Sequence, residues 1–484
     1  MPSIRKNLAY NTILSASQVL LPLISIPYIS RVLDPEGIGK VSFIDSFTYY
    51  FISIAEFGIV VYGMREIARI KDNVAQRGKV VSELLALHVL SSCIALVLYL
   101  VSIFFVWDKI RDVRLLLFSL SFLLVNFFAC EWYFLGMERF KYITIRSLIT
   151  RLLGLASIFV LIKAPDDYYI YYATITLAAI GNSLWNNYLL FKEVPISFKG
   201  INWKKHIAYT KITYFISLTY GVTLLLDNVL LRMMSTAAAV AFYAFPMKIA
   251  RTFSALLTDS LLVFFPRIVA FLKDNDRVQV QRVLLKNLQL LIFFGIPVSA
   301  GLYLVAEQLI SVFLGDQFLP AVNNLRILAF FPLLRSYNLF LSKQVLITHN
   351  KEGLYLVSLT TGSILFVVLT LVLSYYFADT GACYAILAAE LLMLGMNYYF
   401  ARRTAAGLQL FDTKALWQAC ASAALIIPVV YLVKRYGSSS LVILSGAAGI
   451  GALVYFSVQL FVMRNDFSII VKNKIVQYLS RMRG

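Results

Sequence analysis

The sequence is poor in the residues that enzymes and metalloproteins use for chemistry. It has three histidines, far apart, and only four cysteines, which are scattered without a CxxC pair: Cys93, Cys130, Cys383 and Cys420. This spacing supports neither a zinc site nor a disulfide framework. No GxxxxGK[ST], HExxH or GxSxG sequence occurs either, so we expect no ATP-driven pump, no catalytic residues, no bound metal and no cofactor.

Charged residues are also scarce. They make up 14% of the 484 residues, against 60% hydrophobic residues and a mean hydropathy of +0.77. A soluble protein has about 25% charged residues, and apolar runs of about 20 residues indicate transmembrane helices. No stretch is long and polar enough for a soluble domain. The composition therefore predicts an all-α, polytopic membrane protein.

Fourteen apolar runs are candidate membrane spans, joined by short connections. The one modest linker is 193–208, which follows the sixth span. We expect the spans near 9–29, 41–63, 82–106, 114–135, 142–162, 169–191, 209–231, 238–265, 286–306, 322–345, 354–377, 381–401, 415–433 and 441–463.

The distribution of lysine and arginine predicts the orientation of these spans. With a cytoplasmic N-terminus, 29 of the 44 basic residues lie in inward segments and nine in outward segments. The outward nine are Arg31, Lys40, Lys109, Arg111, Arg114, Lys163, Arg232, Lys434 and Arg435. Because basic residues gather in cytoplasmic loops, we expect both termini to be cytoplasmic. The net charge of +19 has this explanation, and no RNA-binding motif points to a nucleic-acid partner.

A weak internal repeat relates two halves of the chain. The segment 135–154 resembles 346–365, and 27–43 resembles 228–245, both at an offset of roughly 200 residues. Six spans per repeat would give the halves the same orientation, a known transporter plan. We therefore predict an N-terminal six-helix bundle (1–192), a cytoplasmic linker (193–208), a C-terminal six-helix bundle (209–403), and two further helices with a basic tail (404–484).

Six basic residues fall inside the predicted spans: Arg146, Arg151, Lys248, Arg251, Arg326 and Arg335. A charge in the hydrocarbon costs several kcal/mol, so such residues face a cavity, a partner or the membrane interface. Arg146 lies about 6 Å into its span and can snorkel, whereas Arg151 lies about 13 Å deep, where snorkelling is harder. Buried ion pairs are the structural alternative for all six.

The eighth span carries three charges on one face. Arg251 lies about 60° and Asp259 about 20° from Lys248 at 100° per residue. We favour a wet, basic cavity wall for this face, with an interhelical salt-bridge cluster as the alternative.

Acidic residues in the spans are candidates for ion coupling. Asp45 and Glu56 lie about 20° apart on the second span, and Tyr49 shares their face. Glu56 could titrate or bind Na⁺, and it could equally be the counter-ion of Arg151. Glu390 and Asp227 are further candidates with weaker geometry. Asn182, Asn186 and Asn187 form a polar stripe on the sixth span, which is often only helix–helix contact.

Three N-terminal segments resemble one known family. PYISRVLDPEGIGKVSF (27–43), AEFGIVVYGMREIARIKD (55–72) and EWYFLGMERFKYITIRSLITRLLG (131–154) are similar to segments of Wzx-type O-antigen and polysaccharide flippases. These belong to the multidrug/oligosaccharidyl-lipid/polysaccharide exporter superfamily. The resemblance implies two six-helix bundles around a central cavity that opens alternately to each side. Spans thirteen and fourteen exceed the twelve usual for O-antigen flippases, so a relative that carries capsule or exopolysaccharide units stays an alternative.

The resemblance also implies a function. It implies translocation of an undecaprenyl-diphosphate-linked oligosaccharide across the bacterial inner membrane, with H⁺ or Na⁺ coupling in some members. The lipid-linked oligosaccharide and membrane lipids would be binding partners, and a polysaccharide polymerase and chain-length machinery further partners. Since Arg and Lys match phosphate, we predict that the headgroup contacts Arg146, Arg151, Lys248, Arg251 and Arg335. Ion coupling is assigned to Glu56 or Asp259, with Asp45 and Glu390 as further candidates.

Two other functional classes compete with this interpretation. A drug or small-cation antiporter of the same superfamily needs an acid-dominated cavity, whereas this chain buries more bases. A membrane polymerase or ligase would typically present a large outward loop, and the longest outward loops here are about ten residues.

Overall fold

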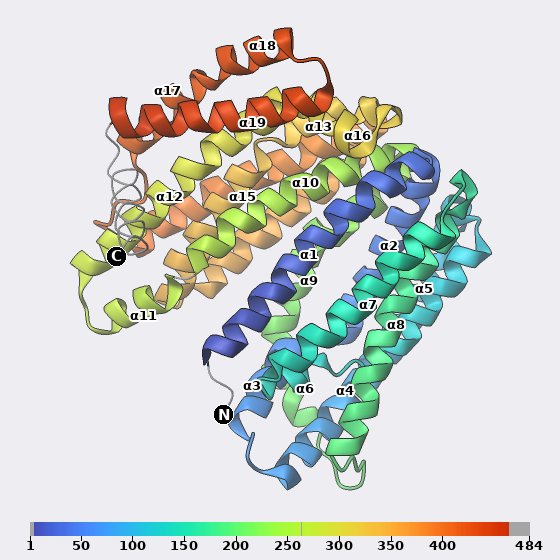
Figure 1. Cartoon of the computed structure of the whole chain (residues 1–484). Coiled ribbons are helices and arrows are strands. Elements are labelled where there is room, and N and C mark those ends of the chain that lie inside the picture. Colours follow the sequence, from blue (N-terminus) through green and yellow to red (C-terminus); the bar gives the residue numbers. More distant parts are fainter. Residues whose placement is uncertain (1–3, 263, 464–484) are drawn as a thin grey trace, which may run out of the picture. The chain divides into compact units, whose positions relative to one another are not determined.

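The chain is built from helices. The computed structural model describes residues 4–262 and 264–463, and every regular element in these ranges is helical, as the composition predicts. The chain divides into two compact units, unit 1 (Met1–Ala241) and unit 2 (Phe242–Gly484), and each is described by itself (Figure 1).

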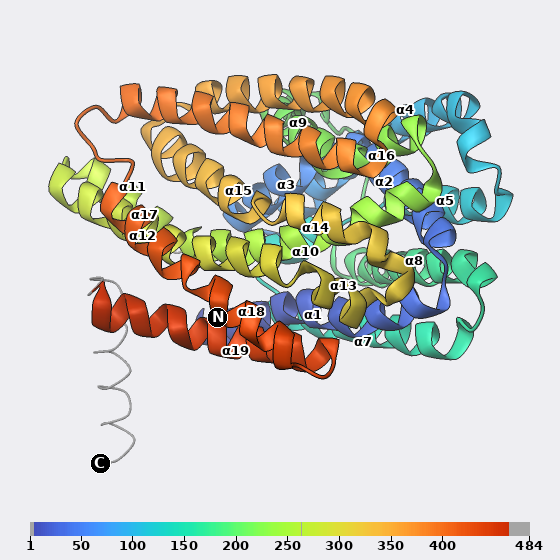
Figure 2. The same ribbon diagram turned by 90° about the horizontal axis from the view of Figure 1, so that it is seen from above.

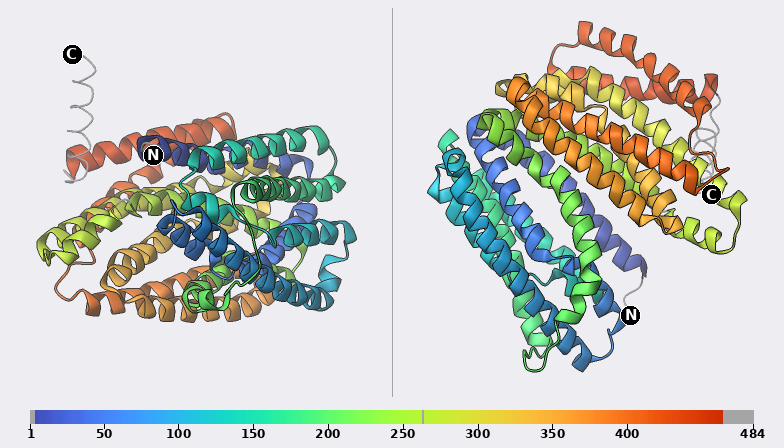
Figure 3. Two further views of the ribbon diagram at one scale, coloured as in Figure 1. Left: turned by 90° about the horizontal axis from the view of Figure 1, so that it is seen from below. Right: turned by 180° about the vertical axis from the view of Figure 1, so that it is seen from behind.

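Unit 1 is a bundle of long helices with two short ones. In it α1 packs on α7, α2 on α4 and α9, and α5 on α8 (Figure 3). The helices are α1 (Ile4–Val32), α2 (Pro35–Glu56), α3 (Ile59–Arg69), α4 (Val74–Ile110), α5 (Val113–Asn126), α6 (Glu131–Gly136), α7 (Phe140–Leu161), α8 (Tyr168–Glu193) and α9 (Lys204–Met234), with a 3₁₀ turn η1 (Pro165–Asp167) before α8.

The second predicted span is bent. The sequence predicts one helix over 41–63, but α2 ends at Glu56 and α3 leaves at an angle of 43°. Phe57 and Gly58 both have left-handed backbone conformations, with φ of 46° and 70°. A Cβ on Gly58 would lie 2.9 Å from the carbonyl oxygen of Thr210 in α9. Glycine therefore meets both a backbone and a packing requirement at the bend.

Unit 2 contains the C-terminal part of α10 (Ala237–Leu262) and all later helices. Helix α12 packs on α15 and α17, and α18 packs on α19 (Figure 2). The helices are α11 (Phe265–Lys273), α12 (Arg277–Leu304), α13 (Ala306–Leu314), α14 (Val322–Leu328), α15 (Phe331–Leu339), α16 (Glu352–Thr404), α17 (Thr413–Ala424), α18 (Ile426–Tyr436) and α19 (Ser440–Ser457). Short η segments cover Asp316–Ala321 (η2), Phe340–Leu346 (η3), Ile347–His349 (η4) and Val458–Val462 (η5).

Helix α16 reverses direction near its middle. Ala378 has φ 48° and ψ −126°, which no helix accommodates. The two halves then pack on each other, since the Ser358 hydroxyl donates to the Met393 carbonyl at 3.3 Å. The reversal separates the two spans expected at 354–377 and 381–401.

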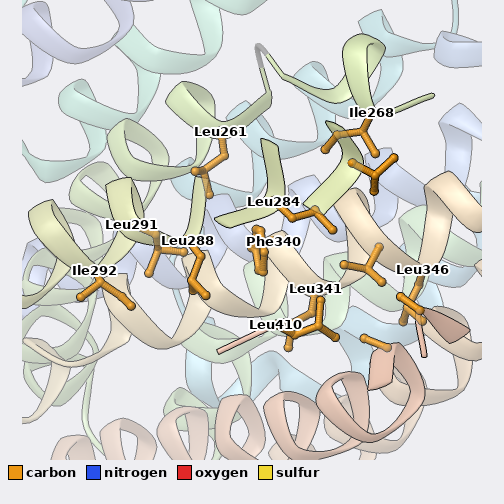
Figure 4. Close-up of a cluster of buried hydrophobic side chains, with 14 of the residues drawn as sticks. Leu261, Ile268, Leu284, Leu288, Leu291, Ile292, Phe340, Leu341, Leu346 and Leu410 are labelled. Carbon is orange, nitrogen blue, oxygen red and sulfur yellow. The ribbon is translucent and has the colours of Figure 1, made fainter. Parts of the chain in front are cut away.

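A cluster of aliphatic and aromatic side chains fills the core of unit 2 where α11, α12, α15 and η3 meet, beside one buried amide pair, in which Asn287 donates to Gln344 at 2.7 Å. Figure 4 shows this cluster, in which Leu284, Leu288 and Phe340 are each at most 1% exposed. The buried polar side chains of this region have partners within the protein, since Gln344 also donates to the Leu261 carbonyl at 2.9 Å.

By length and hydropathy alone, seven helices among the described residues can cross a membrane, or eight if α2 and α3 form one bent span. Fourteen spans stay a prediction. The difference has physical sources: α16 counts once although it reverses, and the span expected at 322–345 is broken into α14, α15 and η3.

Candidate functional site

Arg146 is buried in unit 1, and both of its terminal nitrogens have protein partners. Its side chain is 1% exposed, and Nη2 donates to Glu131 Oε2 at 2.5 Å. Nη1 donates to the Asn186 amide oxygen, and the guanidinium lies over the Tyr142 ring at 5.5 Å. The sequence predicted that Arg146 contacts a headgroup, but here both terminal nitrogens are committed to protein. It therefore holds α6, α7 and α8 together.

The polar stripe on α8 follows the same interface. Thr150 donates to Asn182 at 3.1 Å, Tyr142 donates to Asn186 at 3.0 Å, and Cys130 contacts Asn187 at 3.1 Å. These amides therefore fix α8 against its neighbours, as polar residues do between membrane helices.

Arg151 is different, because no carboxylate among the described residues lies at ion-pair distance from it, and Glu131 acts on it only from farther away. It is half-buried on α7, and Nη1 donates to the Ser17 hydroxyl of α1 at 2.8 Å. No ion pair joins Arg151 to Glu56 or to any other acid in the ranges that the structure describes. A hydroxyl satisfies one N–H but does not neutralise a charge. The Arg151 guanidinium can therefore still form an ion pair with an anion.

The charged face of α10 is open in unit 2. Lys248 and Asp259 are exposed, and Arg251 is half-buried. Thr252, one residue beyond Arg251, donates back to the Lys248 carbonyl at 2.8 Å, so the helix is regular between them. The expected common face of Lys248, Arg251 and Asp259 is therefore compatible with a regular helix.

Arg335 and Glu390 form a buried ion pair in unit 2. Their side chains are 7% and 1% exposed, and Nη1 lies 2.8 Å from Oε1. Asn338 donates to Glu390 Oε2 at 2.7 Å, and Asn397 donates to Asn338 at 3.1 Å. The sequence predicted a headgroup contact for Arg335 and an ion-coupling role for Glu390. In the structure the two groups pair with one another, and the two roles stay predictions.

The acids of α2 differ in their surroundings. Glu56 is half-buried at the last position of the helix, beside the bend, and has no hydrogen-bond or ion-pair partner among the described residues. Asp45 lies earlier in α2 and is half-buried, and Tyr49, between the two acids, is 37% exposed. The predicted coupling role of Glu56 stays a prediction.

A buried network closes the end of unit 1 that the charge count places inward. Glu83 of α4 is 0% exposed; its carboxylate lies 2.7 Å from Lys205 Nζ and 2.9 Å from His206 Nε2, both at the start of α9. Tyr62 of α3 lies 2.8 Å from His206 Nδ1. Burial lowers the pKa of His206, so the imidazole is neutral at neutral pH. Nε2–H then donates to Glu83 and the Tyr62 hydroxyl donates to Nδ1.

A pocket of about 550 Å³ lies over this network. It is lined by Tyr62, Arg65, Glu66, Arg69, Val80, Lys205, His206 and Tyr209. Tyr62 and Tyr209 are stacked at 5.9 Å, and Arg69 pairs with Glu66 at 2.8 Å. Two aromatic faces beside several cations suit a ligand that combines sugar rings with phosphate. The sequence pattern singles out none of these residues, although their basic character is visible in the inward segments.

The sequence matches the model of a known protein family. A family model described as polysaccharide biosynthesis protein matches residues 4–272, more than half of the sequence. The chain belongs to this family. A relative from Escherichia coli K12, named "Putative O-antigen transporter", is 26% identical over 416 residues, covering 83% of this chain and 97% of its own. A Shigella dysenteriae protein of the same name is 24% identical over 395 residues, covering 81% and 98%.

Solved structures share the fold. The lipid II flippase MurJ in an inward closed conformation aligns with a TM-score of 0.71 at 14% identity, covering 96% of this chain and 99% of its own. An inward-facing multidrug resistance MATE transporter of the MOP superfamily aligns at 0.61 and 15% identity, covering 81% and 95%. The chain therefore has the transporter fold that the sequence resemblance implied, and these relatives are transporters and flippases, not enzymes.

Proposed function

We propose that this protein flips an isoprenyl-diphosphate-linked oligosaccharide, on an undecaprenyl carrier, across the bacterial inner membrane. The observation that carries the proposal is Arg151, a half-buried cation in an apolar helix, which has a hydroxyl partner and no ion pair among the described residues. Family membership and the O-antigen transporter relatives supply the substrate class.

The headgroup of such a substrate is a diphosphate. Arginine binds phosphate oxygens in a bidentate manner and lysine as a point charge. Arg151 in unit 1 and Lys248 and Arg251 in unit 2 are the spanning residues to which we assign headgroup contact. Arg146 and Arg335 take a positioning role, because Glu131 and Glu390 neutralise them.

The pocket beside Tyr62 and Tyr209 is the proposed first docking place. Arg65 is exposed there, and the Lys205 side chain is 44% exposed although it pairs with Glu83. The stacked tyrosines offer a surface on which a sugar ring can lie, while the cations attract the diphosphate. Transport by alternating access would then carry the headgroup past Arg151, with the prenyl tail in lipid. Ion coupling, by H⁺ or Na⁺, is assigned first to Glu56.

The test is a flipping assay in proteoliposomes. A lipid-linked oligosaccharide is supplied on one leaflet, and its appearance on the other is measured with a sugar-oxidising reagent that does not cross the bilayer. Arg151→Gln keeps a donor for Ser17 but removes the charge, and we expect flipping to fall about tenfold or more, the loss of one charge-assisted hydrogen bond. Arg151→Lys should retain part of the rate.

Lys163→Gln is the matched control. It removes one positive charge just beyond the end of α7. Lys163 is exposed there, and among the described residues its side-chain ammonium group bonds only to the Tyr28 hydroxyl and a backbone carbonyl. We expect it to flip at the wild-type rate. Wild-type flipping by Arg151→Gln, in protein that elutes and melts like the wild type, would refute the assignment of Arg151. Absence of flipping by the wild-type protein itself would refute the proposed function.

A further inference from the structure

Five of the nine basic residues that the charge count places outward converge on one pocket of unit 1. The pocket has a volume of about 520 Å³, within the range of small-molecule sites, about 300–1,000 Å³. Its lining comes from α2, the turn between α4 and α5, the start of α8 and the end of α9. The charged lining residues are Lys40, Lys109, Arg111, Arg114 and Arg232, with Asp108 and Asp112.

Three of these cations already have a carboxylate. Arg111 lies 2.8 Å from Asp108, Arg114 lies 3.3 Å from Asp112, and Lys40 lies 3.6 Å from Glu36, which is outside the lining. The carboxylates are therefore occupied, and they leave Lys109 and Arg232 without an acidic partner in the part of the chain that the structure describes.

Arg232 is the less solvated of these two. Nη1 donates to the Ser235 carbonyl and Nη2 to the Lys109 carbonyl, both at 3.0 Å. Nε is buried and has no acceptor among the described residues. Backbone carbonyls satisfy two N–H groups but bring no negative charge, so only the more distant Glu36 offsets the charge of the guanidinium, and the buried Nε–H donor stays unused. An unmade hydrogen bond of a buried charged group weakens the native state, and an anion in the pocket that Arg232 lines would lower the cost of burying this cation.

Lys109 lies beside it with an unused ammonium group. Its carbonyl holds Arg232, but its Nζ makes no hydrogen bond or ion pair among the described residues. The Tyr168 ring lies on the same lining, where Lys40 approaches it at 5.3 Å. An anion of two or more oxygens placed between Lys109 and Arg232 would neutralise both cations.

We infer that this outward pocket is a phosphate-binding site, in which Arg232 and Lys109 bind the phosphate oxygens. Nothing in the proposed transport of the headgroup past Arg151 requires this site, so it stands on its own geometry. The phosphate can come from a phospholipid headgroup or from the diphosphate of an isoprenyl-linked sugar, because both present the same oxygens. Arginine and lysine are the residues that bind such groups in proteins.

The test uses the full chain purified in detergent and titrated with inorganic pyrophosphate by calorimetry. We expect saturable binding, about tenfold weaker in Lys109→Gln, which loses one charge-assisted contact. Lys109→Gln is the main variant because the Lys109 side chain makes no contact that the described fold needs. Arg232→Gln should weaken binding as well, but it also removes two bonds to the backbone.

Two controls separate this pocket from other cationic places. Arg435→Gln removes an outward charge that does not line the pocket, and we expect unchanged affinity. Arg151→Gln should also leave this binding event intact, so failure of the pocket and failure of the proposed headgroup path are distinguishable. Absence of pyrophosphate binding, or equal affinity in wild type and Lys109→Gln, would overturn the inference.

A lipid arm identifies the source of the phosphate. The same titration is made in detergent free of phospholipid and in nanodiscs that contain phosphatidylglycerol. If pyrophosphate binds more weakly in the presence of phosphatidylglycerol, and Lys109→Gln abolishes this difference, the result would support the site with a phospholipid headgroup as its ligand. Equal binding in detergent and in phosphatidylglycerol nanodiscs would support it with a diphosphate as its ligand.

Discussion

Glu131 and Arg146 form an ion pair in which one partner is buried and the other is not. Glu131 Oε2 lies 2.5 Å from Arg146 Nη2, yet the glutamate side chain is 49% exposed and the arginine 1%. The pair is therefore asymmetric. If its partner is removed, the carboxylate is still solvated by water, whereas the guanidinium is out of reach of water.

This asymmetry predicts unequal costs of two substitutions. Glu131→Ala leaves a buried cation with only the neutral Asn186 amide and the Tyr142 ring as partners, and we expect a loss of about 3–5 kcal/mol of stability. Arg146→Met leaves a half-exposed carboxylate, and its cost should be smaller, about 1–2 kcal/mol. Thermal unfolding midpoints of the two purified variants, compared with wild type, check the order. The opposite order would mean that Glu131 does not neutralise Arg146.

The Arg335–Glu390 pair should show strong coupling, because both of its members are buried. Arg335→Met or Glu390→Gln alone should each cost about 3 kcal/mol, since each leaves one polar partner unmatched. The double variant should recover much of the loss, because the amide oxygen of a glutamine at position 390 would still accept from Asn338. A double-mutant cycle of unfolding free energies measures this coupling, and additive losses would contradict it.

The membrane class and the helical content follow from composition, because apolar runs separated by short charged loops have few alternatives. The bend at Phe57–Gly58 is signalled by a glycine but not located by it, since glycine is also common in straight membrane helices. The reversal at Ala378 appears in the sequence only as a short gap between two predicted spans. Such breaks depend on tertiary packing, which a single sequence does not display.

The candidate charges can be found from sequence, but their pairing cannot. A buried arginine stands out in an apolar run, whereas its counter-ion can be any acid in a loop. Glu131 escapes notice because it lies 15 residues before Arg146, at the start of a separate short helix. The Glu83–His206 contact escapes for the same reason, since 123 residues separate its members. Which acid pairs with a buried base therefore depends on contacts between residues that are far apart in the sequence.

Glu56 is the acid for which we expect a coupling phenotype. It is half-buried at the α2–α3 bend and has no partner in the described ranges, whereas Glu390 is held by Arg335. In proteoliposomes with an imposed pH or Na⁺ gradient, Glu56→Gln should remove the acceleration caused by the gradient. Asp108→Asn, at an exposed outward turn, is the control. An undiminished gradient response in Glu56→Gln would move the coupling role to Asp259 or Asp45.

His206 should make stability fall in mild acid. Burial holds the pKa of His206 below its ordinary value, about 6.5. The unfolded chain therefore takes up a proton that the native state does not, so stability falls as the pH decreases below about 6.5. His206→Asn should flatten this part of the profile of melting temperature against pH, measured from neutral to mildly acidic buffer. An equally steep decline in the variant would assign the acid sensitivity to other groups.

Asp112 should contribute stability that is lost in stronger acid. It caps α5 by accepting from the backbone N–H of Arg114 at 2.9 Å, and Tyr168 donates to it at 2.6 Å. Burial alone would raise the pKa of Asp112, but the hydrogen bonds from Tyr168 and Arg114 outweigh it and hold the pKa below its ordinary value of about 3.9. The native state thus favours the charged form.

The charge and the cap of Asp112 can be separated by two substitutions. Asp112→Ala removes both and should cost about 1–2 kcal/mol near neutral pH. Asp112→Asn keeps a capping oxygen and should cost less. Because the native pKa is depressed, the contribution of the charge is complete above about pH 4 and disappears as the pH falls through the native value. The difference between wild type and Asp112→Asn in unfolding experiments should therefore be present at neutral pH and shrink in strong acid. A difference that is independent of pH would show that the carboxylate acts through its shape and not through its charge.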